Sequence, residues 1–153
     1  MNKKVDVTDV SNIVVRFSGD SGDGMQLTGT IFSNLSAVFG NQIATFPDYP
    51  AEIRAPQGVL FGVSGFQVHI GTKVFNSGDK TDALVAMNPA ALKVNAKFIK
   101  KDAIILVDSD SFGPKDLEKA EFKTDNPFNE LGLVTQQILA IPITTLTKES
   151  LAE

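Results

Sequence analysis

The sequence predicts an α/β fold of the Rossmann-like type, in which helices flank a mainly parallel sheet. Short β-branched and apolar runs of strand length alternate with segments of helical periodicity. A glycine-rich loop at residues 19–24 joins the first run to the first helical segment. A second glycine-rich stretch interrupts this rhythm, and it predicts a hairpin-like antiparallel excursion in the middle of the sheet.

Length and charge limit the class of protein. The 153 residues, 42% of them hydrophobic, suffice for one core, so we expect a flexible lead-in at 1–12 and a single domain at 13–153. A net charge of -4 without a basic run gives no indication of nucleic-acid binding. Charged residues or glycines interrupt every apolar segment, and the first residues lack a secretory pattern. We therefore expect a cytoplasmic protein without membrane contact.

The sequence contains no cysteine and a single histidine, His69. Iron-sulfur clusters, disulfides and thiolate nucleophiles all need cysteine, so this chain supplies none of them. One histidine cannot build a multi-histidine metal site, and we predict no metal ligands. Any redox chemistry must come from a bound cofactor or another chain.

The first half predicts a strand, a helix and a second strand. The strand covers residues 13–17, and the helix follows the glycine loop, with apolar residues repeating every three or four positions. Gly29 lies one turn into this helix and would let it approach the sheet closely; a tolerated helix glycine is the alternative. A strand at 43–46 then completes a βαβ unit. The apolar helix residues are Leu27, Ile31, Leu35 and Val38.

The middle and second half predict the rest of the sheet. Residues 66–70 alternate as a half-buried strand does, and a turn leads to a short strand at 74–75. Parallel strands are expected at 83–87, 103–107 and 138–141. The helix predicted at 89–98, directly after the strand at 83–87, should direct Leu92 and Phe98 toward the core. Residues 108–127 are charged and turn-rich, and a helix start at 146–151 suggests the N-terminal fragment of a longer subunit.

The loop after the first strand is the candidate binding site. Gly19, Gly22 and Gly24 leave backbone N–H groups free to approach a phosphate, and the following helix N-terminus attracts anions. The spacing matches neither the dinucleotide fingerprint nor a P-loop, so a tight strand-to-helix turn is the alternative. Asp20 and Asp23 would repel a polyanion unless a cation intervened. Capping of the helix by Asp23 is at least as good an explanation.

Two further side chains could reach the same crevice. Arg54 follows the second predicted strand and is suited to a phosphate or carboxylate. An ion pair with a nearby acid, or a contact to another subunit, explains it equally well. Asn88 directly follows the strand at 83–87 and precedes Pro89, so capping of its own helix is its favoured role.

Four segments, in the same order along the chain, closely resemble segments of the alpha subunit of 2-oxoglutarate:ferredoxin oxidoreductases. These enzymes belong to the 2-oxoacid:ferredoxin oxidoreductase family. The four segments are VRFSGDSGDGMQLTG at 15–29, FPDYPAEIRAP at 46–56, GVSGFQVH at 62–69 and LVAMNPAAL at 84–92. The resemblance implies a gamma-type domain that supports coenzyme A docking through Gly19, Ser21, Gly22 and Gly24. Thiamine diphosphate, Mg²⁺ and iron-sulfur clusters would lie elsewhere in a complex that reduces ferredoxin. The domain would pack against thiamine-binding domains and be inactive alone.

Two alternatives remain open from the residues. An independent nucleotide-binding Rossmann domain could use Asp48 as a ribose-binding acid, about 20 residues beyond the loop. A purely structural interface domain would instead bury the loop and Arg54 against protein.

Overall fold

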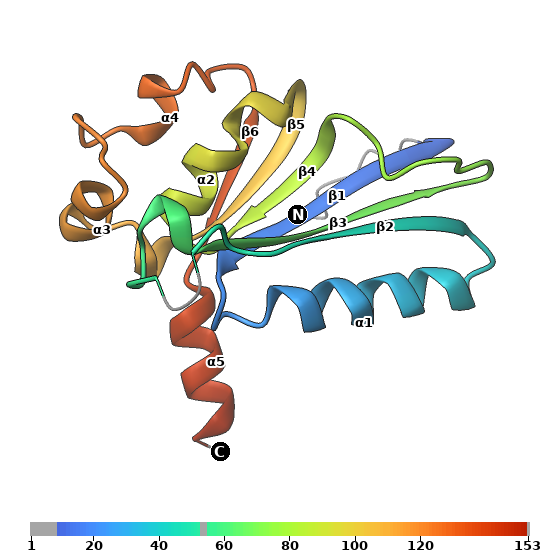
Figure 1. Ribbon diagram of the computed structural model, residues 1–153, viewed down its shortest axis with the longest axis horizontal. Helices are drawn as coiled ribbons and strands as arrows, with labels where there is room; N and C mark the ends of the chain where they lie inside the picture. The colour runs from blue at the N-terminus through green and yellow to red at the C-terminus, as the bar shows by residue number, and fades with distance from the viewer. Residues whose placement is uncertain (1–8, 53–54, 153) are drawn as a thin grey trace, which may run out of the picture.

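The computed structural model describes residues 9–52 and 55–152. Its centre is a six-stranded sheet with the strand order β2-β3-β1-β4-β5-β6, and helices cover both faces (Figure 1). The strands are β1 (Asn12–Asp20), β2 (Gln42–Asp48), β3 (Val63–Gly71), β4 (Thr81–Ala86), β5 (Ile99–Asp108) and β6 (Gln137–Ile141). The α-helices are α1 (Met25–Val38), α2 (Pro89–Asn95), α3 (Pro114–Lys119), α4 (Pro127–Glu130) and α5 (Ile143–Leu151), and short 3-10 turns are η1 (Leu60–Gly62), η2 (Ala96–Phe98) and η3 (Ser109–Ser111).

The sheet is mainly parallel, as predicted. Strands β1, β4, β5 and β6 pair in parallel in that order. Strand β3 is antiparallel to both of its neighbours, β1 and β2. The antiparallel excursion in the middle of the chain is therefore confirmed, and it is inserted next to the central strand.

Two details of the predicted strand pairing are wrong. The strand predicted at 43–46 belongs to β2, which lies at the sheet edge and is separated from β1 by β3. Residues 74 and 75 lie in a loop, so the antiparallel partners of β3 are β1 and β2. Strand β3 was predicted to be half-buried, but eight of its nine residues are buried. Burial on both faces explains why it sits inside the sheet.

Each face of the sheet has its own apolar core. One core joins α1 to β1 and β3, with Phe17, Phe66 and Val68 among its buried residues. The other joins α2 to β4 and β5, with Leu92 and Ile105 fully buried. In Figure 1, α1 and α5 lie on one side of the sheet, and α2, α3 and α4 lie on the other. The domain is thus a three-layer arrangement around a central sheet.

The apolar stripe of α1 faces away from the sheet, contrary to the expected packing of an amphipathic helix. Leu27 is 65% exposed and Leu35 is 56% exposed, and Ile31 and Val38 are exposed as well. The buried side of α1 contains Met25, Gly29 and Ser33 instead. The reason is close packing, because a Cβ at Gly29 would overlap the Phe66 ring. The predicted role of Gly29 is confirmed, and small residues rather than leucines form the helix–sheet contact.

This orientation gives a simple test. Leu27→Gln together with Leu35→Gln is expected to change the free energy of unfolding by no more than about 0.5 kcal/mol, because both side chains are already in water. Urea denaturation followed by circular dichroism measures it. A loss of several kcal/mol would mean that the stripe is packed against the domain after all.

The remaining helices differ in several respects from those predicted from the sequence. The predicted helix 89–98 divides into α2 and η2, and Leu92 is buried as expected. Phe98 does not reach the core, because the α-helix ends at Asn95 and the 3-10 turn leaves its ring 39% exposed. The turn-rich segment 108–127 contains α3, which the sequence did not predict. The predicted helix start at 146–151 belongs to α5, a helix with no buried residue.

Candidate functional site

The predicted loop lies at the carboxyl edge of the sheet, beside the central strands. Strands β1 and β4 are parallel neighbours, and Ser18 pairs with Ala86 just before both strands end. Gly19 follows Ser18, and a Cβ there would lie 3.0 Å from the Cβ of Met87. The absence of a side chain at Gly19 therefore lets the loop approach the end of β4. This is the position at which α/β sheets bind ligands.

The loop presents backbone N–H groups to solvent. The turn closes through a hydrogen bond from the Asp23 N–H to the Asp20 carbonyl oxygen, at 3.0 Å. Gly24 has φ 74° and forms the N-cap of α1, a left-handed conformation that glycine adopts without strain. Ser21, Gly22 and Gly24 are exposed. The N–H groups of the first helical turn have no partner within the helix, and that turn contains no acidic residue. An anion can therefore approach the N-terminus of α1.

Asp23 does not cap α1. Its carboxylate accepts a hydrogen bond from the Asp20 N–H at 2.7 Å, which tightens the loop. The prediction of a capping role is wrong because Gly24 occupies the N-cap position. Partial burial of the carboxyl group raises the pKa of Asp23, and the carboxylates of Asp20 and Asp108 raise it further against the opposing effect of the Asp20 N–H. Asp20 itself is buried and accepts a hydrogen bond from the Gly58 N–H at 2.9 Å.

The raised pKa of Asp23 has a consequence for stability. A group whose pKa is higher in the folded state favours folding while it is protonated, and that contribution is lost as pH rises through the folded pKa. Asp23→Asn keeps an oxygen for the Asp20 N–H but cannot ionise. We expect the variant to be more stable than the parent at neutral pH, with the difference shrinking as pH falls through the raised pKa of Asp23 and gone below the ordinary aspartate value of about 4. Urea midpoints across pH measure this, and a variant less stable at pH 7 contradicts it.

Asn88 caps its helix as predicted. Its Oδ1 accepts the Ala91 N–H at 2.9 Å, and Pro89 follows at the first helical position. The cap places Asn88 beside Asp20 and Asp23 at the wall of a small cavity. The predicted Arg54 lies outside the described residues, so its position in the site stays a prediction.

Asp108 anchors the far side of the site at the end of β5. This fully buried carboxylate accepts hydrogen bonds from the Thr144 hydroxyl at 2.6 Å and the Ser111 hydroxyl at 3.0 Å. The N–H groups of Thr144 and Asp110 donate to it at 3.3 Å each. Burial alone would raise the pKa of Asp108, but these donors outweigh burial and hold the pKa below its ordinary value. Asp108 therefore fixes the start of α5 next to the loop.

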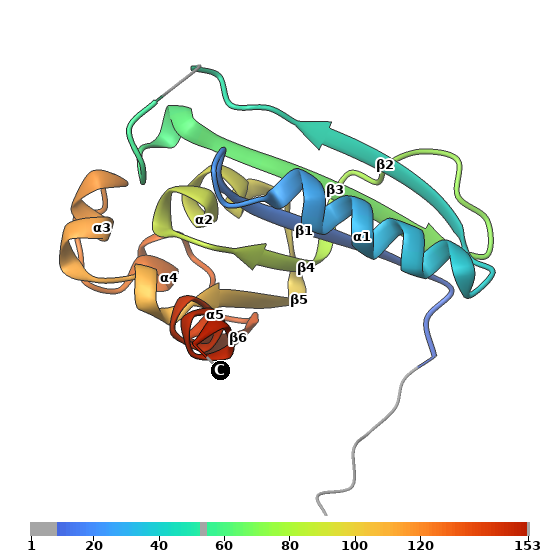
Figure 2. The same cartoon turned by 90° about the horizontal axis from the view of Figure 1, so that it is seen from below.

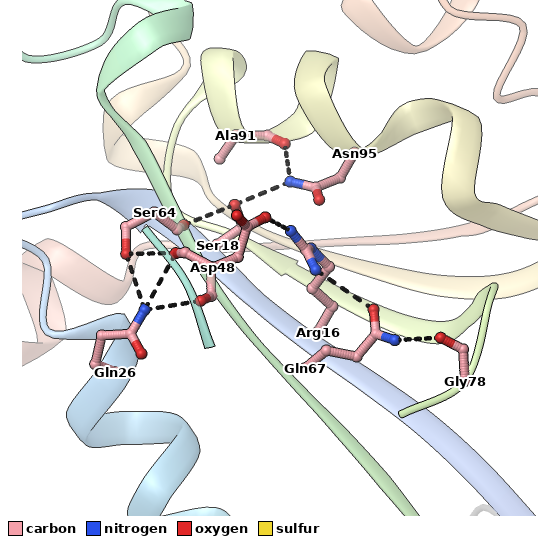
Figure 3. A network of polar contacts seen from close by, with 10 residues as sticks. Arg16, Ser18, Gln26, Asp48, Ser64, Gln67, Gly78, Ala91 and Asn95 are labelled. Atoms are coloured by element: carbon pink, nitrogen blue, oxygen red, sulfur yellow. Dashed lines mark hydrogen bonds and ion pairs between the residues drawn. The ribbon is translucent and has the colours of Figure 1, made fainter. Parts of the chain in front are cut away.

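A polar network under the loop contains residues that sequence reasoning did not select (Figure 3). Buried Arg16 on β1 pairs with Asp48 on β2 and reaches Gln67 on β3 between them. Gln26, in the first turn of α1, donates to the carbonyl oxygens of Gly65 at 2.8 Å and of Asp48 at 3.2 Å. The network fastens the start of α1 to the antiparallel strands. The sequence contained one signal for this network, which is the single charged residue Arg16 within an otherwise apolar strand.

Comparison with known proteins gives the family. Residues 14–153 match the pyruvate ferredoxin/flavodoxin oxidoreductase family, and the chain belongs to it. A curated relative, the 2-oxoglutarate oxidoreductase subunit KorA of Mycobacterium tuberculosis, is 48% identical over 139 residues, which are 90% of this chain and 21% of the relative. The chain thus spans about a fifth of the length of that relative.

Solved structures share the fold. A 2-oxoglutarate:ferredoxin oxidoreductase from Magnetococcus marinus, with 2-oxoglutarate, coenzyme A and succinyl-CoA bound, aligns with a TM-score of 0.69 at 23% identity, covering 92% of this chain and 22% of that one. The gamma subunit of a keto/oxoacid ferredoxin oxidoreductase from Geobacter sulfurreducens aligns with a TM-score of 0.64 at 23% identity, covering 92% and 66%. At 23% identity, these alignments show a shared fold and nothing further.

The described residues contain neither a metal-binding cluster nor a helix that could cross a membrane. Within 9–52 and 55–152, no three acidic, histidine or cysteine side chains gather in a way that could hold a metal ion. No helix in the same ranges has the length and apolar character that a membrane crossing requires.

Proposed function

We propose that this chain is the gamma-type domain of a 2-oxoacid:ferredoxin oxidoreductase, that the 2-oxoacid is 2-oxoglutarate, and that the domain docks coenzyme A. The observation that carries the proposal is the exposed glycine loop over the N-terminus of α1, at the carboxyl edge between β1 and β4. Bare backbone and free N–H groups suit a phosphate-bearing ligand. The curated KorA relative and the coenzyme A in the Magnetococcus structure support this choice of ligand and substrate.

The domain has a supporting task rather than a catalytic one. With no cysteine in the sequence, it supplies no thiolate for iron-sulfur clusters, which belong with thiamine diphosphate and Mg²⁺ in other parts of the complex. The outer face of α1 supports an assembly function, because it combines exposed Leu27, Ile31 and Leu35 with a helix that contains no charged residue. Thiamine-binding domains are the proposed neighbours, ferredoxin is the proposed electron acceptor of the whole complex, and the cytoplasm is the proposed location.

An independent NAD-binding domain is less well supported. Its proposed ribose-binding acid, Asp48, is paired with Arg16, and β3 separates its strand from β1. A purely structural domain would explain the outer face of α1 but not the free N–H groups of the loop.

A valine in the loop tests coenzyme A docking. Nothing lies within 4 Å of a Cβ built at Gly22, so Gly22→Val should fold normally yet block close approach to the backbone. We expect coenzyme A to shift the amide signals of residues 19–25 in the parent chain, and the variant to bind about tenfold more weakly or worse.

The matched control is Asn34→Val on the exposed side of α1, away from the loop. It should bind coenzyme A as the parent does. Amide signals of residues 19–25 that stay unmoved at millimolar coenzyme A, in a folded parent chain, would refute docking by this domain.

A further inference from the structure

A cavity of about 530 Å³ lies on the face of the sheet opposite α1. Its floor contains the side chains of Arg16 on β1 and Gln67 on β3, which are paired residues of adjacent strands. Val15 and Phe17 belong to the core beneath α1, so Arg16 between them points to the opposite face. Among the described residues, this cavity shares no lining residue with the two cavities beside the glycine loop, which are the small polar one next to Asn88 and an apolar one of about 480 Å³ walled by α1 and α5.

Arg16 is a buried cation with unused hydrogen-bond donors. Its side chain is 8% exposed, whereas the side chain of its ion-pair partner Asp48 is 43% exposed. One terminal nitrogen donates to Asp48, and the other donates to the Gln67 Oε1 at a long distance of 3.4 Å (Figure 3). Within the part of the chain that the structure describes, the buried Nε has no hydrogen-bond partner. Because a guanidinium has more N–H groups than these contacts use, and an unpaired buried donor is costly, Arg16 is suited to a second acceptor.

The surroundings of the guanidinium are fixed by close packing. Gly65 on β3 faces it, and a Cβ at Gly65 would lie 3.0 Å from the Arg16 Nη2. The Gln67 Nε2 donates to the carbonyl oxygens of Ser77 and Gly78, at 2.7 Å and 2.6 Å, and so fixes their loop as a wall of the cavity (Figure 3). The cavity is therefore preformed, as ligand sites commonly are.

The charges of the lining favour a monoanion. Three cations line the cavity, which are Arg16, Lys80 and Lys97. Two acids, Asp48 and Asp79, line it as well, which leaves an excess of one positive charge. This excess attracts an anion, but the two acids oppose the denser charge of a phosphate. The planar guanidinium matches a carboxylate, which can accept two N–H groups at once.

Two aromatic rings stand beside these charges. Phe46 on the edge strand β2 is 50% exposed, and Phe98 at the end of η2 is 39% exposed. Both rings line the cavity. A ligand whose apolar part covers these rings removes them from water, which is favourable.

We propose that this cavity binds a small organic monocarboxylate with an aromatic or apolar body. The carboxylate accepts the Arg16 N–H groups that Asp48 leaves free, and the body lies against Phe46 and Phe98. The site is separate from the glycine loop, so it does not depend on the proposed docking of coenzyme A.

The arginine side chains report such binding directly. Arg16 and Arg54 are the arginines of the sequence, so an Arg54→Lys variant assigns their Nε–H signals in an NMR spectrum. Phenylacetate at millimolar concentration should shift the Arg16 Nε–H signal, and neutral phenylacetamide should leave it in place. Inorganic phosphate should shift it less than phenylacetate does. An Arg16 signal that phenylacetate does not move, or that phosphate moves equally, overturns the proposal.

Reversed charges at the rim test the site by affinity. Lys80 and Lys97 are exposed, so Lys80→Glu combined with Lys97→Glu leaves the core intact. We expect phenylacetate to bind about tenfold more weakly. The matched control is Lys115→Glu combined with Lys123→Glu, which changes the net charge equally at exposed positions outside the cavity lining and should bind as the parent does. Equal losses in both double variants contradict a local site.

The apolar part of the site has a test of its own. The parent should bind phenylacetate about tenfold more tightly than acetate, because acetate has no ring. Phe46→Thr removes one aromatic wall and keeps a strand-forming residue, so it should narrow this preference. Phe39→Thr is the matched control, since Phe39 is 83% exposed at the end of α1 and outside the lining, and it should keep the preference. A parent that binds acetate and phenylacetate equally refutes the proposed ligand class.

Discussion

Gly29→Ala is expected to destabilise the domain by about 3 kcal/mol, although alanine is the better helix former by about 1 kcal/mol. The added methyl group would overlap the ring of Phe66, which is buried between α1 and β3. Either the helix must move off the sheet or the ring must leave its rotamer, and both disturb the core beneath α1. Steric overlap therefore outweighs the gain in helix propensity.

Equilibrium unfolding in urea measures this effect. Thr30→Ala, at the next position and exposed, is the matched control and should change the unfolding free energy by less than about 0.5 kcal/mol. If Gly29→Ala were as stable as the parent, α1 would not lie against β3 as described.

Asp108→Ala is expected to cost about 3 kcal/mol at neutral pH. The substitution removes the acceptor of four hydrogen bonds and leaves the donors of Thr144, Ser111 and Asp110 at the end of β5 without it. The N-terminus of α5 should loosen as a result. Asp110→Ala is the comparison, because Asp110 accepts one exposed hydrogen bond, from the Thr145 N–H at 2.7 Å, and its loss should cost about 1 kcal/mol.

The pH dependence of this difference has a definite sign. A carboxyl group whose pKa is lowered by folding contributes stability above its unfolded pKa, and loses it as pH falls through the folded value. The gap between the parent and Asp108→Ala should therefore be full above about pH 5 and shrink below about pH 4. A gap that stays constant down to pH 2 would show that ionisation of Asp108 does not contribute.

Local sequence patterns predicted elements well and their partners less well. The strand at 13–17, the loop at 19–24 between strand and helix, and the Asn88 cap all depend on neighbouring residues, and the structure confirms them. The insertion of β3 between β1 and β2 depends on pairing between residues about 50 positions apart. The residue pattern of a strand does not specify which distant strand it will pair with. Such pairings are decided by burial over the whole domain.

The face that α1 presents to the sheet does not follow from its apolar periodicity. Periodicity identifies an apolar stripe but does not say what it contacts, and Leu27 and Ile31 look like core residues in any helical projection. Gly29 and Ser33, which do face the sheet, contribute little to such a pattern. In the candidate site, glycine spacing located the loop, whereas the apolar cavity beside it required residues from α5 that only the tertiary structure brings near.

The position of β1 also bears on how the chain reaches its native state during synthesis. The two strands that flank β1 are β3 and β4, so its first hydrogen-bonded partner leaves the ribosome some 50 residues after β1 itself. Because synthesis adds about 5 to 20 residues per second, β1 stays without a hydrogen-bonded partner strand for several seconds. Nascent chains arrested before Gly71 has left the ribosome should accordingly be protease-sensitive throughout, and resistance should begin only when β3 has emerged.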